Sequence, residues 1–553
     1  MKEEQRLPRR WYAFIIGITI ILAVCTVFGY AAAKSKADGD RDCDLSNIEL
    51  LGKYVFFDKI SSPPRMACVT CHDPATGGTG SVSGVNLHQV AITGANPHTV
   101  GNLKPPTNAY ASLIESFHDC NTGGLGPRNK CGGNFWNGRA EGNETALFEG
   151  ATRHIGEEIF YTTDGYLIND VYCNHANDAQ NIADLLAEFG EYFGPTADQA
   201  LNPPPNPVEQ NIERQAVCEY VASAKYAPLY KEVWGVEIDC SDDAVLVSAP
   251  DVGASSEKAF DISFKRLMLA VCAWQDSSDL NSFSSKRDIA LQQELDCLNG
   301  SQNAIPQVCT HDNYTNSPGV FPLVGLTEQE NYGHDLFYAT ILNPLNVGTV
   351  EEPVFKVSNC AFCHSDIPNA FGVLNPNTGD ELFQLYSADD YHNIGTPPNP
   401  EIPVTFASNG DQIDPDLGIA GHASALAGRP GFFKTPTLRN VDKRKGKGFI
   451  KAYTHNGWFK SLESIVHFYN TAAVDGATAA GFGVTRCPEG IETEREALKY
   501  NCWPAPAHVG APLGFLIGDL GLTLEDEAAL VAYMKTLTDQ HTAKPPKPYK
   551  PGD

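Results

Sequence analysis

The sequence predicts a mainly α-helical chain of two domains with long loops and insertions, preceded by an N-terminal transmembrane helix. Several segments have the apolar spacing of amphipathic helices, and strand-like alternation is scarce. One pentapeptide pattern, Cys-x-x-Cys-His, occurs twice, far apart in the chain. We expect an anchor and linker at residues 1–40, domains at 41–320 and 321–545, and a tail at 546–553.

The composition narrows the class of partner and the compartment. The 67 acidic and 40 basic residues give a net charge of -27, which argues against a nucleic-acid partner and suits a basic protein. The 16 cysteines are many for a reducing cytosol. We therefore expect an exported protein.

The N-terminus supports export. Basic residues precede an apolar run at 11–30, and three alanines follow it. A run of about 20 residues is long for a signal peptide and long enough to cross a bilayer as a helix. We favour an uncleaved anchor over a cleaved signal peptide, and a lipoprotein attached through Cys25 is the weakest alternative. In each case the body of the chain lies outside the cytoplasm.

Each Cys-x-x-Cys-His pentapeptide is an attachment signature of c-type haem. Two thiols one helical turn apart can bond to both vinyl groups of one porphyrin, and the adjacent imidazole can then ligate the iron. The alternatives are a zinc site, a redox dithiol and a disulfide, but zinc needs four ligands close together and two chance occurrences are rare. The residues are Cys68, Cys71 and His72 in the first motif and Cys360, Cys363 and His364 in the second.

Four segments with amphipathic spacing, the last opening on a cap-like Thr523, predict helices between long loops, as in c-type cytochrome domains. They lie at 178–192, 257–274, 461–469 and 524–537. Insertions are expected at about 142–194 and 288–318. Apart from the four haem thiols and Cys25, eleven cysteines remain, an odd number whose pairing the sequence leaves open. Pairs that could close local loops are Cys120/Cys131, Cys297/Cys309 and Cys487/Cys502.

Further segments resemble the bacterial di-haem cytochrome c peroxidase family, and more narrowly its tyrosine-ligated branch, which includes the maturase MauG. They occur in family order from about residue 46 to residue 540. The segments are LGKYVFFD at 51–58, GNLKPPT at 101–107, NFWNGR at 134–139, NPVE at 206–209, NIG at 393–395, FKTPTLRNV at 433–441 and YTHNG at 453–457. The resemblance implies a periplasmic enzyme with two covalently bound haem c groups, a peroxidatic one in the first domain and an electron-transfer one in the second.

The resemblance assigns the distal ligand of the second haem to Tyr469. In the family this ligand lies fourteen residues after the position of His455, and it is Met in ordinary peroxidases and Tyr in the MauG-like branch. Composition agrees, because none of the three methionines beyond the initiator lies in this segment. The alternative is a tyrosine that packs on a helix face.

At the first haem, the resemblance aligns Glu209 with a distal carboxylate and Gln199 with its polar neighbour. A carboxylate there could relay a proton between the two oxygens of hydrogen peroxide, whereas without the motif Glu209 would be a surface residue. His88, sixteen residues after His72, has the spacing of a distal ligand in ordinary peroxidases. The segment at 73–80 instead resembles the branch that lacks this ligand, so His88 is either a ligand that closes the resting site or a loop residue.

Between the haems, Trp136 resembles the family's bridging tryptophan, a role compatible with an ordinary core position. The side chain of Asn102 and the carbonyls of Ile450 and Ala452 resemble the ligands of an interhaem calcium ion.

We expect an enzyme that reduces hydrogen peroxide with electrons from a redox protein, such as a small cytochrome c or a cupredoxin. A MauG-like enzyme would instead use peroxide to oxidise tryptophan or tyrosine side chains of a partner protein. Ser358 stands where the maturase has a tryptophan, which argues against methylamine dehydrogenase as that partner. A non-catalytic di-haem electron carrier is the third alternative.

Overall fold

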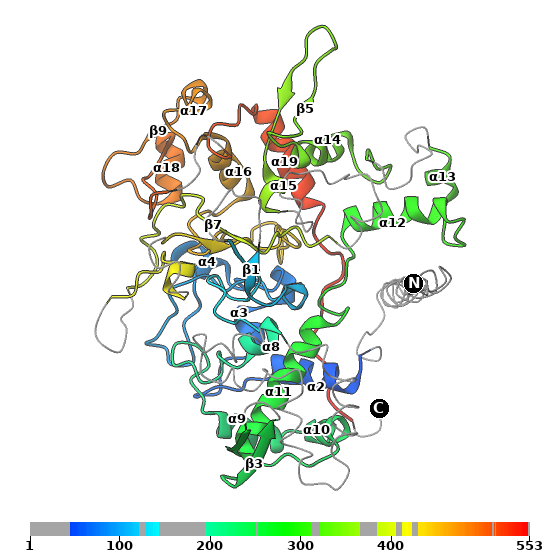
Figure 1. Ribbon diagram of the computed structural model, residues 1–553, viewed down its shortest axis with the longest axis vertical. Helices are drawn as coiled ribbons and strands as arrows, with labels where there is room; N and C mark the ends of the chain where they lie inside the picture. Colours follow the sequence, from blue (N-terminus) through cyan, green and yellow to red (C-terminus); the bar gives the residue numbers. More distant parts are fainter. Residues whose placement is uncertain are drawn as a thin grey trace, which may run out of the picture. The chain divides into compact units, whose positions relative to one another are not determined.

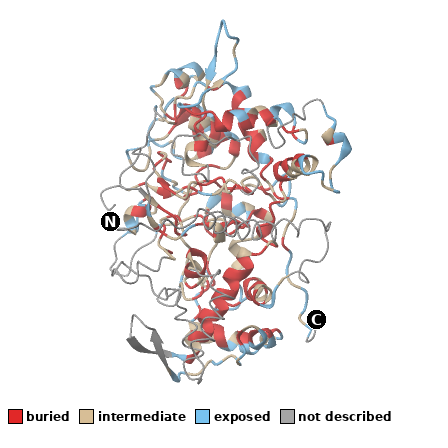
Figure 2. Cartoon of the chain, turned by 45° about the vertical axis from the view of Figure 1, so that its right-hand side comes forward, coloured by how far each residue is buried: buried red, intermediate tan, exposed pale blue. Residues whose placement is uncertain are grey.

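The structure of the chain, a computed structural model, describes residues 45–120, 129–142, 194–249, 253–311, 321–364, 384–404, 412–422, 430–510, 514 and 516–550. From residue 45 onwards the chain forms one compact unit. It contains two large hydrophobic cores, whose buried residues are drawn in red in Figure 2. The first core is built from residues 48–283 and Ala543, and the second from residues 290–537. We call the residues around them the first and the second lobe.

The first lobe is built on α11 (Ala259–Asp276), most of whose residues are buried. Helix α2 (Asn47–Phe57), which starts with a capping box between Ser46 and Glu49, packs against α11 (Figure 1). The two helices approach closely because Gly52 has no side chain; a Cβ atom there would lie 1.8 Å from the carbonyl oxygen of Ala270. The other helices of this lobe are α3 (Cys68–Cys71), η3 (Pro74–Thr76), α4 (Ser83–His88), η4 (Ala111–Leu113), α8 (Pro195–Ala200), α9 (Arg214–Ala222) and α10 (Ala227–Trp234).

The second lobe is built on α14 (Glu328–Tyr338) and α19 (Leu524–Lys535), which pack against each other. Both start with capping boxes, at Thr327 and Thr523. The other helices of this part of the chain are α12 (Lys286–Leu298), α13 (Pro306–Cys309), α15 (Cys360–Cys363), η8 (Ile419–Gly421), α16 (Leu462–Thr471), α17 (Ala477–Phe482) and α18 (Glu494–Tyr500).

Strands are few and short in the described residues, where they form two-stranded sheets. The antiparallel pairs are β1 (His118–Cys120) with β2 (Asn129–Cys131), β3 (Ala244–Ala249) with β4 (Gly253–Lys258), β5 (Leu345–Asn346) with β6 (Phe355–Lys356), and β7 (Tyr391–His392) with β8 (Phe433–Lys434). Strands β9 (Thr485–Arg486) and β10 (Cys502–Trp503) pair in parallel. Helices thus form both cores, as expected, and long loops make up much of the rest.

The predicted helices at 257–274, 461–469 and 524–537 are confirmed as α11, α16 and α19, with ends that differ by at most two residues. The predicted helix at 178–192 and most of the predicted insertion at 142–194 lie outside the described residues. The domain boundary expected at residue 320 stays a prediction.

The predicted transmembrane helix also falls outside the described part of the chain, which begins at residue 45. Among the helices that are described, we find none that combines the length and the apolar character needed to span a membrane. The anchor stays a prediction.

Three disulfides join described cysteines. Two of them, Cys297–Cys309 and Cys487–Cys502, are pairs that the sequence suggested. The third, Cys218–Cys240, links residues 22 apart and was not expected. Cys131 is also disulfide-bonded, and the side chain of Cys120, its suggested partner, lies outside the described residues.

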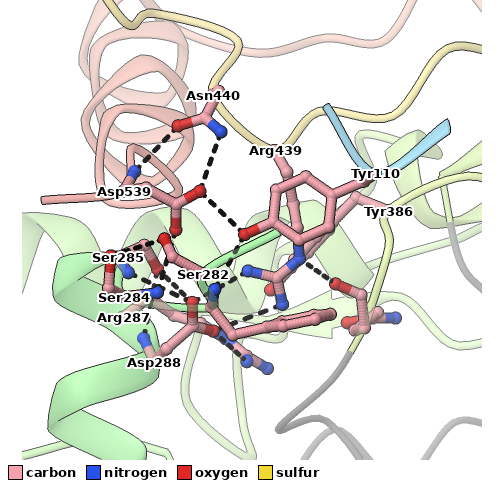
Figure 3. A network of polar contacts seen from close by, with 12 residues as sticks. Tyr110, Ser282, Ser284, Ser285, Arg287, Asp288, Tyr386, Arg439, Asn440 and Asp539 are labelled. Atoms are coloured by element: carbon pink, nitrogen blue, oxygen red, sulfur yellow. Dashed lines mark hydrogen bonds and ion pairs between the residues drawn. The ribbon is translucent and has the colours of Figure 1, made fainter. Parts of the chain in front are cut away.

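A buried polar network joins segments that are distant in the sequence (Figure 3). Asp288 lies between two guanidinium groups, 2.8 Å from Nη1 of Arg439 and 3.2 Å from Nη1 of Arg287. Beside it, Asp539 accepts hydrogen bonds from the Tyr110 hydroxyl (2.7 Å) and the Asn440 amide (2.8 Å). Tyr110 belongs to the first lobe and Asn440 to the segment 433–441, so the network holds the two lobes together.

Candidate functional site

The first Cys-x-x-Cys-His motif forms one helical turn, α3, which His72 terminates. The main-chain N–H of His72 donates to the carbonyl of Cys68 (3.0 Å), and Nδ1 lies 3.0 Å from the carbonyl oxygen of Gly78. A carbonyl only accepts, so Nδ1 carries the proton and Nε2 keeps a free lone pair. Burial lowers the pKa of His72, which favours the neutral imidazole that a metal ion requires.

Glu209 lies beside this motif. Its side chain is half-buried, and Oε1 accepts a hydrogen bond from Nδ2 of Asn206 (2.7 Å). Burial raises the pKa of the Cys68 and Cys71 thiols to about 12, and the Glu209 carboxylate contributes to both shifts. The next residue, Gln210, brings this segment to the motif, with Nε2 4.0 Å from Sγ of Cys68. Burial raises the pKa of Glu209 itself, while the guanidinium of Arg139 opposes this shift.

The other two residues predicted at the first haem lie in different surroundings. Gln199, on α8, lines a small cavity of about 50 Å³ together with Trp136 and Lys434. His88 is the last residue of α4, and its side chain is exposed. Ligation of the first haem by His88 stays a prediction.

The second motif forms the same helical turn, α15, at the wall of a cavity of about 220 Å³. The main-chain N–H of His364 donates to the carbonyl of Cys360 (3.0 Å), and Nδ1 donates to the carbonyl of Tyr386 (2.9 Å). Burial lowers the pKa of His364 to about 4, so this imidazole too is neutral at pH 7.

Tyr469, on α16, lines the same cavity as Cys360, Cys363 and His364. Burial raises the pKa of its hydroxyl, and the two motif thiols raise it further. Met534, on α19, also lines this cavity. Tertiary packing thus brings the thioether of Met534 to the same cavity. The scarcity of methionine near Tyr469 in the sequence is therefore weaker support for Tyr469 as the haem ligand.

Trp136 is buried and lines both cavities. Its Nε1 donates to the carbonyl of Lys104 (2.7 Å), and its own carbonyl accepts from the main-chain N–H of Lys434 (3.0 Å). The ring makes an edge contact with His455, 6.4 Å between centroids. Trp136 thus contacts Lys104, which precedes the second motif, and Lys434 and His455, which follow it. These contacts hold the ring at the second cavity.

One of the three predicted calcium ligands already has a hydrogen-bond donor, and a lysine stands beside it. The carbonyl of Ile450 accepts a hydrogen bond from Nδ2 of Asn86 (2.9 Å), and the buried ammonium of Lys451 is bonded to three other carbonyls nearby. Asn102 is half-buried and Ala452 buried.

Sequence reasoning missed three residues at the site. Lys104 and Lys451 are buried beside Trp136 and line the second cavity. His392 lies against Cys363, with Nε2 2.6 Å from Oδ2 of Asp390. The only sequence signal was position. Lys104 lies within the segment 101–107, and His392 directly precedes the segment 393–395. Lys451 stands between two predicted calcium ligands, Ile450 and Ala452.

The described residues fit two covalently bound haems. None of the four motif thiols is in a disulfide, although seven other described cysteines are. Each motif offers two sulfurs one helical turn apart and a neutral imidazole with its Nδ1 proton hydrogen-bonded. The second motif also faces a cavity lined mainly by apolar side chains, as a porphyrin requires.

Comparisons with known proteins agree with this fit. Residues 46–296 match the family model of the di-haem cytochrome c peroxidases. The di-haem peroxidase BthA from Burkholderia thailandensis and a variant of it each share 20% identity with the chain, at a TM-score of 0.53, over 90% of this chain and 87% of theirs. A MauG-like protein associated with microbial copper homeostasis shares 17% identity at a TM-score of 0.43, over 90% of each chain. No curated protein matches the sequence.

The family match contains the first motif and its surroundings, and the similarity to BthA extends the common fold to the second. Such membership implies two haem c groups, one for each motif. Residues 46–296 of the chain therefore belong to the di-haem cytochrome c peroxidase family.

Proposed function

We propose that the protein reduces hydrogen peroxide at the haem held by Cys68, Cys71 and His72. The reaction is H₂O₂ + 2 H⁺ + 2 e⁻ → 2 H₂O, and it needs a group that holds and delivers protons. The observation that carries the proposal is the half-buried Glu209 carboxylate beside the two thiols of this motif. When bound, the haem supplies the iron at which the O–O bond is cleaved and stores oxidising equivalents.

Glu209 would take a proton from one peroxide oxygen and return it to the other. The amide of Asn206 donates to Oε1 and so limits the orientations of the carboxylate. Gln199 stays a predicted neighbour of the substrate; its place in the cavity beside Trp136 suits a polar group on that side.

Trp136 would carry electrons between the two haems. Its ring is buried, is hydrogen-bonded at Nε1, and lines the cavity that contains the second motif. His364 and Tyr469 would both hold the second haem, and two protein ligands would suit it to electron transfer and not to substrate binding.

The electron donor would be a small redox protein outside the cytoplasm. The net charge of -27 suits a basic partner such as a small cytochrome c or a cupredoxin. The disulfides support an oxidising compartment, for which we propose the periplasm.

A MauG-like oxidation of tryptophan or tyrosine side chains in a partner protein is the second candidate. Ser358, which takes the place of an aromatic residue in the maturase, is buried and its hydroxyl donates to the carbonyl of Leu336 (2.6 Å). The position therefore offers no aromatic ring toward a partner protein, and we favour the peroxidase.

The test is to add one equivalent of hydrogen peroxide to the oxidised holoprotein and to follow its visible and electron paramagnetic resonance spectra. Rapid loss of a high-spin ferric signal, followed by turnover with reduced cytochrome c, is the expected result. Slow turnover with a long-lived oxidised state would favour protein modification. A protein that stays low-spin and inert, even after prior reduction, would be an electron carrier and would contradict the proposal.

A further inference from the structure

Two buried lysines lie where the family resemblance led us to expect calcium. Lys451 stands between Ile450 and Ala452, the two predicted carbonyl ligands, and Lys104 lies two residues after Asn102. They are 4% and 6% exposed, and both line the cavity that contains Trp136. A divalent cation held by these ligands would lie close to both side chains along the chain, and a protonated amine there would repel it.

The ammonium group of Lys451 is fully hydrogen-bonded. Nζ donates to the carbonyl oxygens of Thr76 (2.9 Å), Asn440 (2.8 Å) and Lys443 (3.2 Å). An ammonium has three N–H donors and no acceptor, so these three bonds use its whole capacity. Thr76 follows the first haem motif and Asn440 belongs to the segment 433–441, so one positive group connects carbonyls of both lobes, as a bound cation would.

Lys104 makes a second connection. Its Nζ donates to Oγ1 of Thr79 (2.6 Å) and to its neighbour Pro105 (3.3 Å). Its main-chain N–H donates to the carbonyl of His455 (2.8 Å), and its carbonyl accepts from Trp136. Lys104 thus contacts the loop after His72, the bridging tryptophan and the second lobe.

The loop after His72 is shaped to meet Lys451. Gly77 has a φ of +75°, and a Cβ atom at this residue would lie 2.8 Å from the carbonyl oxygen of Asn440 and 3.3 Å from Nζ of Lys451. The next residue, Gly78, supplies the carbonyl that accepts the Nδ1 proton of His72. The position of the ammonium is therefore coupled to the loop that orients the first proximal histidine.

Burial favours the neutral form of both amines, and the carbonyls oppose it. Burial lowers the pKa of Lys104 to about 7, and it lowers the pKa of Lys451 well below its usual range, with a further contribution from Lys104. A neutral amine, however, has one N–H fewer than the three bonds that Lys451 makes. The three carbonyl acceptors around Lys451 thus favour its charged form.

We propose that Lys104 and Lys451 take the place of the interhaem calcium ion, so that this chain joins its two lobes beside Trp136 without a metal. The inference goes beyond the peroxidase activity and does not depend on it. Metal content and thermal stability are measured without peroxide, so either proposal can fail alone.

The first test uses the native holoprotein. We expect no stoichiometric calcium after transfer to metal-free buffer, as measured by inductively coupled plasma mass spectrometry. We also expect the melting temperature and the electron paramagnetic resonance spectrum to be the same with EGTA and with added calcium chloride. One tightly held calcium ion per chain, or a spectrum that EGTA changes and calcium restores, would overturn the proposal.

The second test replaces the cation. In the holoprotein variant Lys451→Met, three buried carbonyls lose their donor, so we expect a melting temperature several degrees lower and a changed ferric signal from the His72 haem. The matched control is Lys445→Met. It removes a half-exposed lysine that pairs with Asp73 in the loop after His72 (2.7 Å), and it should change neither the melting temperature nor the ferric signal. An unchanged melting temperature in Lys451→Met would contradict the proposal. If this variant does not accumulate, Lys104→Met carries the same expectation, and the metal analysis decides in either case.

Discussion

At the scale of single residues, the site depends on groups that the motifs do not contain. Glu209 lies beside Cys68 and Cys71 although some 140 residues separate them, and Asn206 orients its carboxylate. The approach of Glu209 to the motif could not be derived from spacing along the chain. The resemblance pointed to Glu209, whereas only the structure shows the partner that holds it.

We predict that Glu209→Gln slows the reaction of the oxidised holoprotein with peroxide by about 100-fold or more, because an amide cannot relay a proton. Stopped-flow absorbance would give the second-order rate constant. The control is Glu213→Gln, which changes an exposed residue four positions away and should react as the native protein does. A normal rate in Glu209→Gln, with full haem content, would remove this residue from the mechanism.

The second haem has two possible distal ligands in one cavity, Tyr469 and Met534. If Tyr469 ligates the iron, Tyr469→Phe should raise the reduction potential of this haem, on the order of 100 mV, because an anionic oxygen donor stabilises oxidised iron. Met534→Leu should leave the potential unchanged. Spectroelectrochemical titration would measure both, and the opposite pattern would assign the ligand to Met534.

At the scale of elements, close helix packing depends on residues that lack side chains. Gly52 of α2 lies against the backbone of α11, and Gly333 of α14 lies against that of α19, where a Cβ atom would be 2.0 Å from the carbonyl of Ala529. These glycines are unfavourable for an isolated helix, yet they permit the contacts on which each core is built. Helix propensity alone would not have explained them.

Gly52→Ala should therefore destabilise the protein by about 1–3 kcal/mol or more, since the added methyl group would force α2 away from α11. Gly84→Ala is the matched control: it is in the helix α4 with no atom within 4 Å of the new Cβ, so the change should be neutral or slightly stabilising. Urea denaturation of both holoproteins would measure the difference. Equal stability would show that the helices adjust without cost.

At the scale of the whole molecule, a charged network joins the lobes next to the site. Asp288 and Arg439 are fully buried, and Asn440, the next residue, bonds to Asp539 through its side chain and to Lys451 through its carbonyl. The same segment, 433–441, therefore connects the ion pairs of Figure 3 with the lysines beside Trp136. Breaking a buried pair leaves an uncompensated charge, so this network is sensitive to single substitutions.

Asp288→Asn should cost about 3–5 kcal/mol at pH 7, because it leaves Arg439 and Arg287 without their carboxylate. Burial alone would raise the pKa of Asp288, but the two guanidinium groups lower it from 3.8 to about 2. Because the pKa of Asp288 is lower in the folded than in the unfolded chain, its ionisation adds on the order of 2 kcal/mol to the free energy of unfolding. This contribution is complete above about pH 4 and is lost as the pH falls toward 2.

The difference in unfolding free energy between the native protein and Asp288→Asn should accordingly narrow as pH is lowered from about 4 to 2. Denaturant titrations at several pH values would measure it. The control is Asp242→Asn, which changes an exposed residue and should have the same unfolding free energy as the native protein at each pH. A difference that is independent of pH would show that Asp288 is not ionised through this contact.

Much of this fold was predictable because its signals are local. The helices at 461–469 and 524–537 follow from apolar spacing, and the second also from the cap-like Thr523; the structure has both within two residues. The disulfides Cys297–Cys309 and Cys487–Cys502 close short loops, so proximity in the sequence was enough to predict them. The pair Cys218–Cys240 brings together residues whose approach depends on how α9 packs, and spacing does not encode that.

The sequence by itself determined the covalent chemistry of this protein, since each haem motif is five consecutive residues whose geometry is that of one helical turn. It also supplied the order of segments that identified the family. Tertiary structure alone decided what surrounds the motifs: Met534 in the second cavity, and Lys104 and Lys451 where calcium was expected. The physical reason is that ligand choice and buried charge depend on which atoms meet in space, and these atoms come from segments hundreds of residues apart.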